Sequence, residues 1–134
     1  MNIGIAPTDE AVAKFTELKF QHKHSFIVFK IINDKEIVVD HEGDKTKTFA
    51  DLKSSLPPNE PRYLINNHDY VIEGATRTKI FLILYSPTTT KVRQRMLYAS
   101  AKNTVKSAFD GIQNELDVDE SFREEDLTEK ATRI

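Results

Sequence analysis

The spacing of apolar residues predicts a helix and a hairpin in the first third of the chain. After Thr8, a suitable N-cap, apolar residues recur at helical spacing at Ala11, Val12, Phe15 and Leu18. Residues 25–32 are rich in β-branched and aromatic side chains, which is typical of a strand. Asn33-Asp34 is a turn signal before a second strand over 36–40, so we expect a hairpin.

The middle of the chain predicts one short helix and two more strands. Thr48 and Asp51 resemble a capping box, and the helix they open must stop at Pro57-Pro58. Residues 62–65 form a short expected strand. Residues 79–85 are apolar without alternation, which indicates a strand covered on both faces.

Two helices are expected in the last third. The segment 91–109 contains neither Gly nor Pro and has helical periodicity. Ser121 and Glu124 have the spacing of a capping box, which predicts a final helix carrying Leu127 and Ala131. Alternating helices and strands around one fully buried strand predict an α/β fold of α+β type, with one mixed sheet sandwiched between helices. At 134 residues, we expect one domain over 1–134.

The expected helix over 91–109 carries one large apolar residue, Met96, outside its expected core stripe. Its expected core stripe consists of Leu97, Ala101, Val105 and Ala108, with Tyr98 and Phe109 at the edge. Met96 lies on the opposite side, together with Val92, Ala99 and Asn103. The side chains of Arg93, Arg95, Lys102 and Lys106 flank this face. It is therefore either a protein-binding surface or an ordinary solvated helix face with one exposed methionine.

Composition narrows the class of protein. Hydrophobic residues make up 39% and charged residues 30%, which suits a soluble globular protein. The net charge of −2 argues against nucleic-acid binding, and there is no cysteine for disulfides or thiol chemistry. Neither a secretory signal nor an apolar run of membrane-spanning length is present, so we expect a cytoplasmic protein that is not embedded in a membrane.

No pattern of catalytic or metal-binding residues stands out. His22 and His24 lack an obvious third ligand, and the acidic run from Asp117 to Asp126 lacks the spacing of a calcium loop. Phosphate-binding glycine loops and nucleophile motifs are absent from the sequence. We therefore expect a binding protein without enzymatic activity, cofactor or metal.

The segment from Val92 to Lys102, VRQRMLYASAK, resembles the signature helix of the actin-depolymerising factor/cofilin family. The similarity extends in order along nearly the whole chain. It includes FTELK at 15–19, FIVFKI at 26–31, EIVV at 36–39, LPP at 56–58, Arg62-Tyr63 and KIFLILYSP at 79–87.

This resemblance implies the actin-depolymerising factor homology fold, with a five-stranded mixed sheet, and a monomeric protein that binds actin monomers and filaments and promotes filament disassembly. It implies a monomer-binding surface made of Ile3, Gly4, Ile5, Arg93, Arg95, Met96, Lys102 and Lys106. It also implies a filament-binding surface made of Arg77, Lys79, Glu129, Lys130 and Arg133. The protein would then belong to the actin cytoskeleton.

The sequence departs from the family pattern at several positions. The N-terminal segment has no serine for the family's phosphorylation switch, and its first hydroxyl is Thr8. Tyr85 replaces a tryptophan, and Asn66-Asn67 replaces Tyr-Asp. The connection from Val71 to Thr78 is short for the family, so severing is less strongly expected than monomer binding.

Two other functions remain open. A protein similar to glia maturation factor would bind the actin-related branch complex instead of actin. A phosphoinositide-binding module would use the same cations as the monomer surface, Arg93, Arg95, Lys102 and Lys106.

Overall fold

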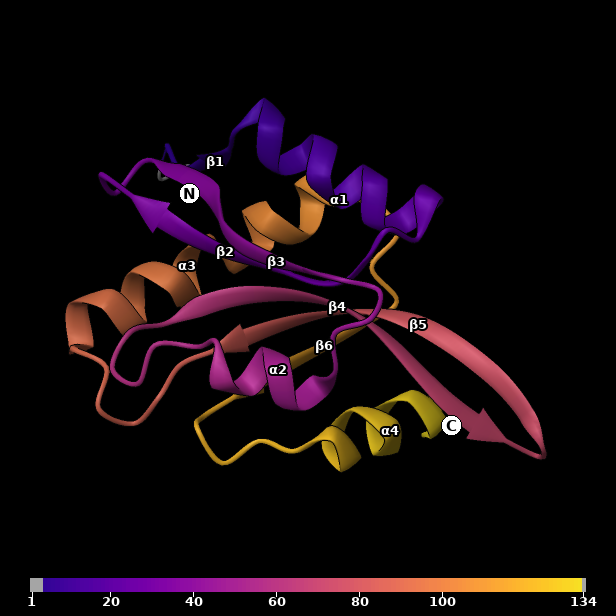
Figure 1. Ribbon diagram of the computed structural model, residues 1–134. Helices are drawn as coiled ribbons and strands as arrows, with labels where there is room; N and C mark the ends of the chain where they lie inside the picture. Colours follow the sequence, from indigo (N-terminus) through magenta and orange to yellow (C-terminus); the bar gives the residue numbers. More distant parts are fainter. Residues whose placement is uncertain (1–3, 134) are drawn as a thin grey trace.

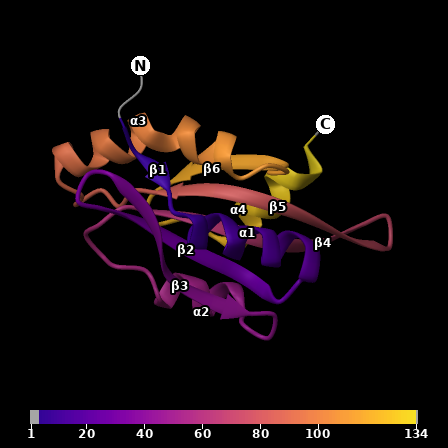
Figure 2. The same cartoon turned by 90° about the horizontal axis from the view of Figure 1, so that it is seen from above.

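The computed structural model describes residues 4–133, which form a curved sheet between two layers of helices (Figures 1 and 2). The helices are α1 (Asp9–Gln21), α2 (Phe49–Ser54), α3 (Val92–Ala108) and α4 (Glu124–Thr132). The strands are β1 (Ala6–Pro7), β2 (His24–Ile32), β3 (Glu36–Asp44), β4 (Arg62–Ile72), β5 (Ala75–Tyr85) and β6 (Asn114–Val118). Their order in the sheet is β1-β3-β2-β4-β5-β6.

The predicted mixed sheet sandwiched between helices is confirmed, with a sixth strand added at the edge. The central strands β3, β2, β4 and β5 are antiparallel, and the outer strands β1 and β6 pair in parallel. The extra strand, β1, has two residues and pairs with Glu36 and Ile37 of β3.

The buried residues form two cores, one on each face of the sheet. Helices α1 and α3 pack against one face through Phe15, Leu18, Ala101 and Val105. Helices α2 and α4 pack against the other face through Leu52 and Leu127. In β5, Leu82 and Leu84 belong to the first core, whereas Phe81 and Ile83 belong to the second. Burial on both faces explains the unbroken apolar run over 79–85.

The segment from Val71 to Thr78 is the outer part of a hairpin and not a loop between two short strands. The strand bounds expected at 62–65 and 79–85 were therefore too short. Strands β4 and β5 continue through it as a hairpin, and Ile72 pairs with Ala75. The turn residues Glu73 and Gly74 both have positive φ, 51° and 79°, which a two-residue hairpin turn of type I′ requires. The outer part of this hairpin projects beyond α4 (Figure 1). Its side chains are polar or exposed because no helix covers them, which hid the strands from pattern analysis.

Two of the three predicted helix starts are confirmed. The Thr8 hydroxyl accepts a hydrogen bond from the Ala11 backbone nitrogen at 3.1 Å. Thr48 and Asp51 form the predicted capping box. The capping box expected at Ser121 was wrong, because Ser121 hydrogen-bonds to the Asp119 carboxylate instead. Helix α4 begins later, where the Asp126 carboxylate accepts a hydrogen bond from the Arg123 backbone nitrogen at 2.8 Å.

A pair of tyrosines joins α3 to the sheet. The Tyr98 hydroxyl accepts a hydrogen bond from the Ile31 backbone nitrogen at 2.8 Å, two residues beyond the last pair between β2 and β4, Phe29 with Tyr63. The Tyr63 hydroxyl donates to the Tyr98 carbonyl at 2.5 Å. Tyr98 is therefore at the centre of the buried helix face, whereas the sequence pattern had placed it at the edge. Burial raises the pKa of both phenols, which keeps them neutral.

We expect Tyr98→Phe to lower the free energy of unfolding by about 1–2 kcal/mol, because it leaves the partly buried Ile31 N–H without an acceptor. Urea denaturation followed by circular dichroism measures this change. The control is Tyr70→Phe, since the Tyr70 hydroxyl has no hydrogen-bond partner within residues 4–133. Equal stability of the two variants would contradict the role given to the Tyr98 hydroxyl.

Candidate functional site

Helix α3 has an outward face for which the sequence predicts a docking role. We call it the docking face and define it as Val92, Met96, Ala99, Ser100 and Asn103. The side chains of Val92 and Met96 are 67% and 65% exposed, whereas Tyr98, Ala101 and Val105 on the opposite side are buried. The Ser100 hydroxyl donates to the Met96 carbonyl at 2.7 Å, so it is turned back onto the helix. The exposed methionine therefore stands beside small side chains that allow close approach of another surface.

Arg93 and Arg95, at the start of α3, have partners within the protein. The Arg93 guanidinium lies 2.5 Å from the carboxylate of Asp34 in the turn between β2 and β3. The hydrogen bond from Arg93 holds the pKa of Asp34 below its usual value. Arg95 donates to the carbonyls of Thr88 and Thr90 at 3.1 and 3.3 Å, which fastens the loop before the helix.

Lys102 and Lys106 lie over the acidic edge strand β6. The Lys102 ammonium is 2.7 Å from Asp117 and 3.5 Å from Glu115. Burial opposes the charge on Lys102, but hydrogen bonds to Asp117 and Glu115 outweigh it and raise the pKa of the amine. Lys106 lies 2.5 Å from Glu115, and its hydrogen bond lowers the pKa of that carboxyl. The sequence had suggested an open positive rim beside the docking face. In the structure, each of these four cations has a partner within the protein.

The N-terminal segment lies beside α3 (Figure 2), and β1 contacts that helix. Of the three predicted contact residues in this segment, Ile3 lies outside the described residues and Gly4 is exposed. Ile5 is only 3% exposed and packs in the core that α1 and α3 share. Its side chain therefore anchors the segment and is not on the surface.

The predicted filament residues come from two elements that touch. The Lys79 ammonium donates to the Ala131 carbonyl of α4 at 2.8 Å, and His68 is hydrogen-bonded to Thr128 at 2.8 Å. These contacts join the base of the β4–β5 hairpin to α4. Arg77 is exposed two residues farther along the hairpin. We call the predicted residues Arg77, Lys79, Glu129, Lys130 and Arg133 the filament surface. The two contacts bring the elements that carry them side by side.

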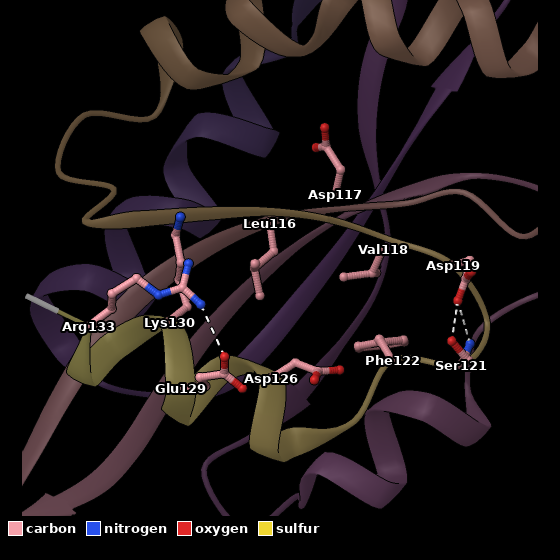
Figure 3. Close-up of a pocket in the computed structure, with 10 residues that line it drawn as sticks. All are labelled: Leu116, Asp117, Val118, Asp119, Ser121, Phe122, Asp126, Glu129, Lys130 and Arg133. Carbon is pink, nitrogen blue, oxygen red and sulfur yellow. Dashed lines mark hydrogen bonds and ion pairs between the residues drawn. The ribbon is translucent and has the colours of Figure 1, made fainter.

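The other three filament residues are on α4 or, for Arg133, directly after its last residue (Figure 3). Arg133 forms an ion pair with Glu129 at 3.1 Å, one helical turn apart. Lys130 points toward β6 and has no ion pair with another residue in 4–133. Together they line a groove of about 380 Å³ between α4 and β6, with Leu116 and Phe122 also in its wall.

Sequence reasoning missed the acids that neutralise α3. Asp34 is 59 residues from Arg93, and Asp117 is 15 residues from Lys102. No periodicity connects such pairs, because they meet only through the packing of α3 against the sheet. The alternation of Glu115, Leu116 and Asp117 was the available signal for β6, with its acids toward α3 and its apolar residue toward α4.

His22 and His24 do not form a metal site together. His22 is exposed at the end of α1 with a φ of 53°, and His24 lies 3.2 Å from Glu42. Between residues 4 and 133, no three or more His, Cys, Asp or Glu side chains are placed to hold a metal ion. Over the same range, no helix is long and apolar enough to cross a membrane.

Comparisons with known proteins identify the family. The sequence model described as cofilin/tropomyosin-type actin-binding protein matches residues 4–133. The chain is 35% identical to actophorin of Acanthamoeba castellanii over 133 residues, 97% of this chain and 96% of actophorin. It is 45% identical to actin-depolymerizing factor 3 of Zea mays over 115 residues, 84% of this chain and 83% of that protein.

A solved structure agrees with the sequence comparisons. The crystal structure of Plasmodium berghei actin depolymerization factor 2 superposes with a TM-score of 0.86 at 31% identity, covering 96% of both chains. Family model, relatives and structure thus coincide over nearly the whole length described. The chain belongs to the cofilin/tropomyosin-type family of actin-binding proteins.

Proposed function

We propose that this protein binds actin monomers through the docking face of α3 and promotes filament disassembly through the additional filament surface. The observation that carries the proposal is Met96, which is largely exposed on a helix whose opposite face is locked into the core. Exposed apolar side chains among small neighbours provide the anchor that a protein partner can desolvate. The relatives named as actin-depolymerizing factors support this function over that of a glia maturation factor.

The two surfaces lie on different parts of the fold. The docking face and the N-terminal segment are on the α1/α3 side, and the filament surface is at the junction of the β4–β5 hairpin with α4. One actin subunit would occupy the first surface, and its neighbour in the filament the second. The protein then acts by binding and not by catalysis, because binding one filament state better than another shifts the filament toward that state.

Several further properties belong to the same proposal. Residues 1–134 act as a single domain and as a monomer, which one continuous sheet with a core on each face supports. The work of the protein is at the cytoplasmic actin cytoskeleton. A phosphoinositide site on α3 is less well supported, because Arg93, Arg95, Lys102 and Lys106 all have partners within the protein.

Sedimentation of filaments tests the function directly. Actin is polymerised with and without the protein, and supernatant and pellet are assayed for both proteins. We expect the protein in the pellet with filaments and a rise of actin in the supernatant. Absence of the protein from the pellet together with unchanged soluble actin would refute the proposal.

The docking face can be tested by truncating its anchor. We expect Met96→Ala combined with Arg93→Ala and Arg95→Ala to keep the fold but weaken monomer binding by about 2 kcal/mol or more, since Met96 is at the centre of the proposed contact. Binding to fluorescently labelled monomeric actin measures the loss. Phe20→Ala is the matched control, because Phe20 is a comparably exposed apolar residue on α1.

Met96→Ala alone should also weaken monomer binding. This single variant separates the contribution of the methionine from any effect of releasing the loop that Arg95 holds. A folded triple variant with unchanged affinity for monomeric actin would rule out the docking face.

The filament surface can be separated from the docking face. We expect Arg77→Ala with Lys79→Ala to weaken filament binding and disassembly while leaving monomer affinity within about twofold, because distant sites act independently. Arg77→Ala alone should show the same selectivity without disturbing the contact between Lys79 and Ala131. Cosedimentation and monomer titration are compared for each variant. Equal losses in the two assays would contradict a two-surface arrangement.

Regulation by phosphorylation near the N-terminus is not expected here. The Thr8 hydroxyl oxygen already accepts the Ala11 N–H, and Asp9 and Glu10 would repel an added phosphate of roughly −2 charge. We therefore expect the protein from its native cells to be unmodified at Thr8 and active without phosphatase. Mass spectrometry provides the measurement. A substantial fraction phosphorylated at Thr8, with actin binding restored by phosphatase, would overturn this expectation.

A further inference from the structure

Three polar side chains, two from β3 and one directly after α2, form a hydrogen-bonded chain. The Ser55 hydroxyl oxygen lies 2.7 Å from Nε2 of His41, and Nδ1 of the same imidazole lies 3.1 Å from the Asp40 carboxylate. Both distances fall in the range of about 2.6–3.2 Å that joins a nucleophile, its general base and the group that orients the base. Serine, histidine and aspartate linked in this order make a serine hydroxyl nucleophilic, and the arrangement is recognised by its geometry and not by sequence position.

A β-bulge in β3 places the carboxylate beside the imidazole. Along a regular strand, the side chains of neighbouring residues point to opposite faces of the sheet. The pairing of β2 with β3 passes from Val28 with His41 directly to Phe29 with Val39, so Asp40 is the extra residue of the bulge. A bulge re-aims the side chains around it. The interruption of the strand therefore allows two neighbours in the sequence to be hydrogen-bonded through their side chains.

Asp40 is held as a carboxylate by two cations. The Arg62 Nε atom lies 3.1 Å from it, and the Lys30 ammonium lies 3.5 Å from it. Burial opposes the charge on Asp40, but the hydrogen bond from Arg62 and the neighbouring positive charges outweigh it and lower the pKa of the carboxyl. An ionised carboxylate only accepts hydrogen bonds, so Nδ1 of His41 carries the proton in their contact. In the neutral imidazole, the basic nitrogen is then Nε2, which faces Ser55.

The backbone holds Ser55 in place while its side chain stays open to solvent. The Ser55 N–H donates to the Asp51 and Leu52 carbonyls at 3.2 and 3.1 Å. The hydroxyl has two acceptors within reach, Nε2 of His41 at 2.7 Å and the Leu52 carbonyl at 2.6 Å. Because a hydroxyl rotates between acceptors, its proton can be donated to the imidazole. Ser55 is exposed and His41 is partly exposed, so a small molecule can approach the serine oxygen.

We propose that Ser55 is a nucleophile that accepts an acyl group from an activated ester. The Ser55 oxygen forms a bond to the acyl carbon, and the bond between that carbon and the alcohol oxygen of the ester breaks. The hydroxyl proton passes to Nε2 of His41 and from there to the departing alcohol oxygen, while Asp40 orients and stabilises the imidazolium. The products are the acylated serine and the free alcohol.

The exposure of Ser55 indicates the class of acyl donor. An exposed side chain gives the donor little binding energy, so the reactivity must come from a good leaving group, as in an aryl ester with a small acyl group. Asp40, His41 and Ser55 belong neither to the docking face nor to the filament surface. The proposal therefore does not rest on the proposed function.

Acetylation by 4-nitrophenyl acetate tests the site, with Ser54 as the control within the same protein. Ser54 is also exposed at the end of α2, but its hydroxyl donates to the Asp51 carbonyl at 3.2 Å instead of facing an imidazole. Peptide mass mapping gives the rate at each serine, and neutral hydroxylamine removes acetyl groups from serine esters but not from lysine amides. We expect Ser55 to react at least about 100-fold faster than Ser54, because general-base catalysis contributes about 10²–10⁴-fold. Equal rates at the two serines would overturn the proposal.

Replacement of the base separates its chemistry from its position. His41→Gln keeps a polar side chain beside Ser55 but cannot take up the proton, so acetylation of Ser55 should fall about 100-fold while that of Ser54 stays unchanged. In the unaltered protein, the rate at Ser55 should reach a plateau with rising pH once His41 is neutral. In the variant, it should instead rise about tenfold per pH unit, as expected for an unassisted hydroxyl.

Circular dichroism shows whether His41→Gln is folded. An unchanged rate at Ser55 in the folded variant would overturn the proposal, and so would the lack of a plateau in the unaltered protein. The comparison of Ser55 with Ser54 and the pH profile of the unaltered protein do not depend on the folding of the variant.

Discussion

The hydrogen bond between the Tyr98 hydroxyl and the Ile31 N–H determines how α3 lies on the sheet. It forms where β2 has passed the end of its pairing with β4, so the tyrosine takes the place of a neighbouring strand. The ring of Tyr63 lies 5.1 Å from that of Tyr98, and its hydroxyl donates to the Tyr98 carbonyl, so Tyr63 fixes the same turn of the helix to β4. Since one side of α3 is fixed in this way, the rotation of the whole helix is fixed and Met96 must point outward.

Ion pairs hold the two ends of α3 as the tyrosines hold its middle. Arg93 reaches the β2–β3 turn, and Lys102 and Lys106 reach β6. Each such pair contributes little to stability when exposed, but together they join the helix to the β2–β3 turn and to the edge strand β6. The filament surface is assembled similarly, since Lys79 and His68 connect the hairpin to α4. Both proposed actin surfaces therefore depend on contacts between elements that are distant in the sequence.

The sequence predicted the parts of the fold that are set by burial along one element. The bounds of α3, the exposure of Met96 and the two-sided burial of β5 all follow from local periodicity. The outer part of the β4–β5 hairpin was not predicted, because its residues face solvent and show no periodic burial. The ion pairs of Asp34 and Asp117 with α3 were not predicted either, because only tertiary packing brings these two carboxylates to the helix. The family resemblance indicated the site residues but gave no sign that Ile5 is in the core.

The internal partners of α3 have a consequence for the speed of binding. A cation that already faces a carboxylate projects little field into solvent, and the net charge of the chain is only −2. Encounters with actin are then guided by diffusion and shape, at about 10⁵–10⁶ M⁻¹s⁻¹, and depend weakly on ionic strength. In the proposed complex, the lifetime is set instead by how slowly the side chain of Met96 leaves its proposed apolar contact.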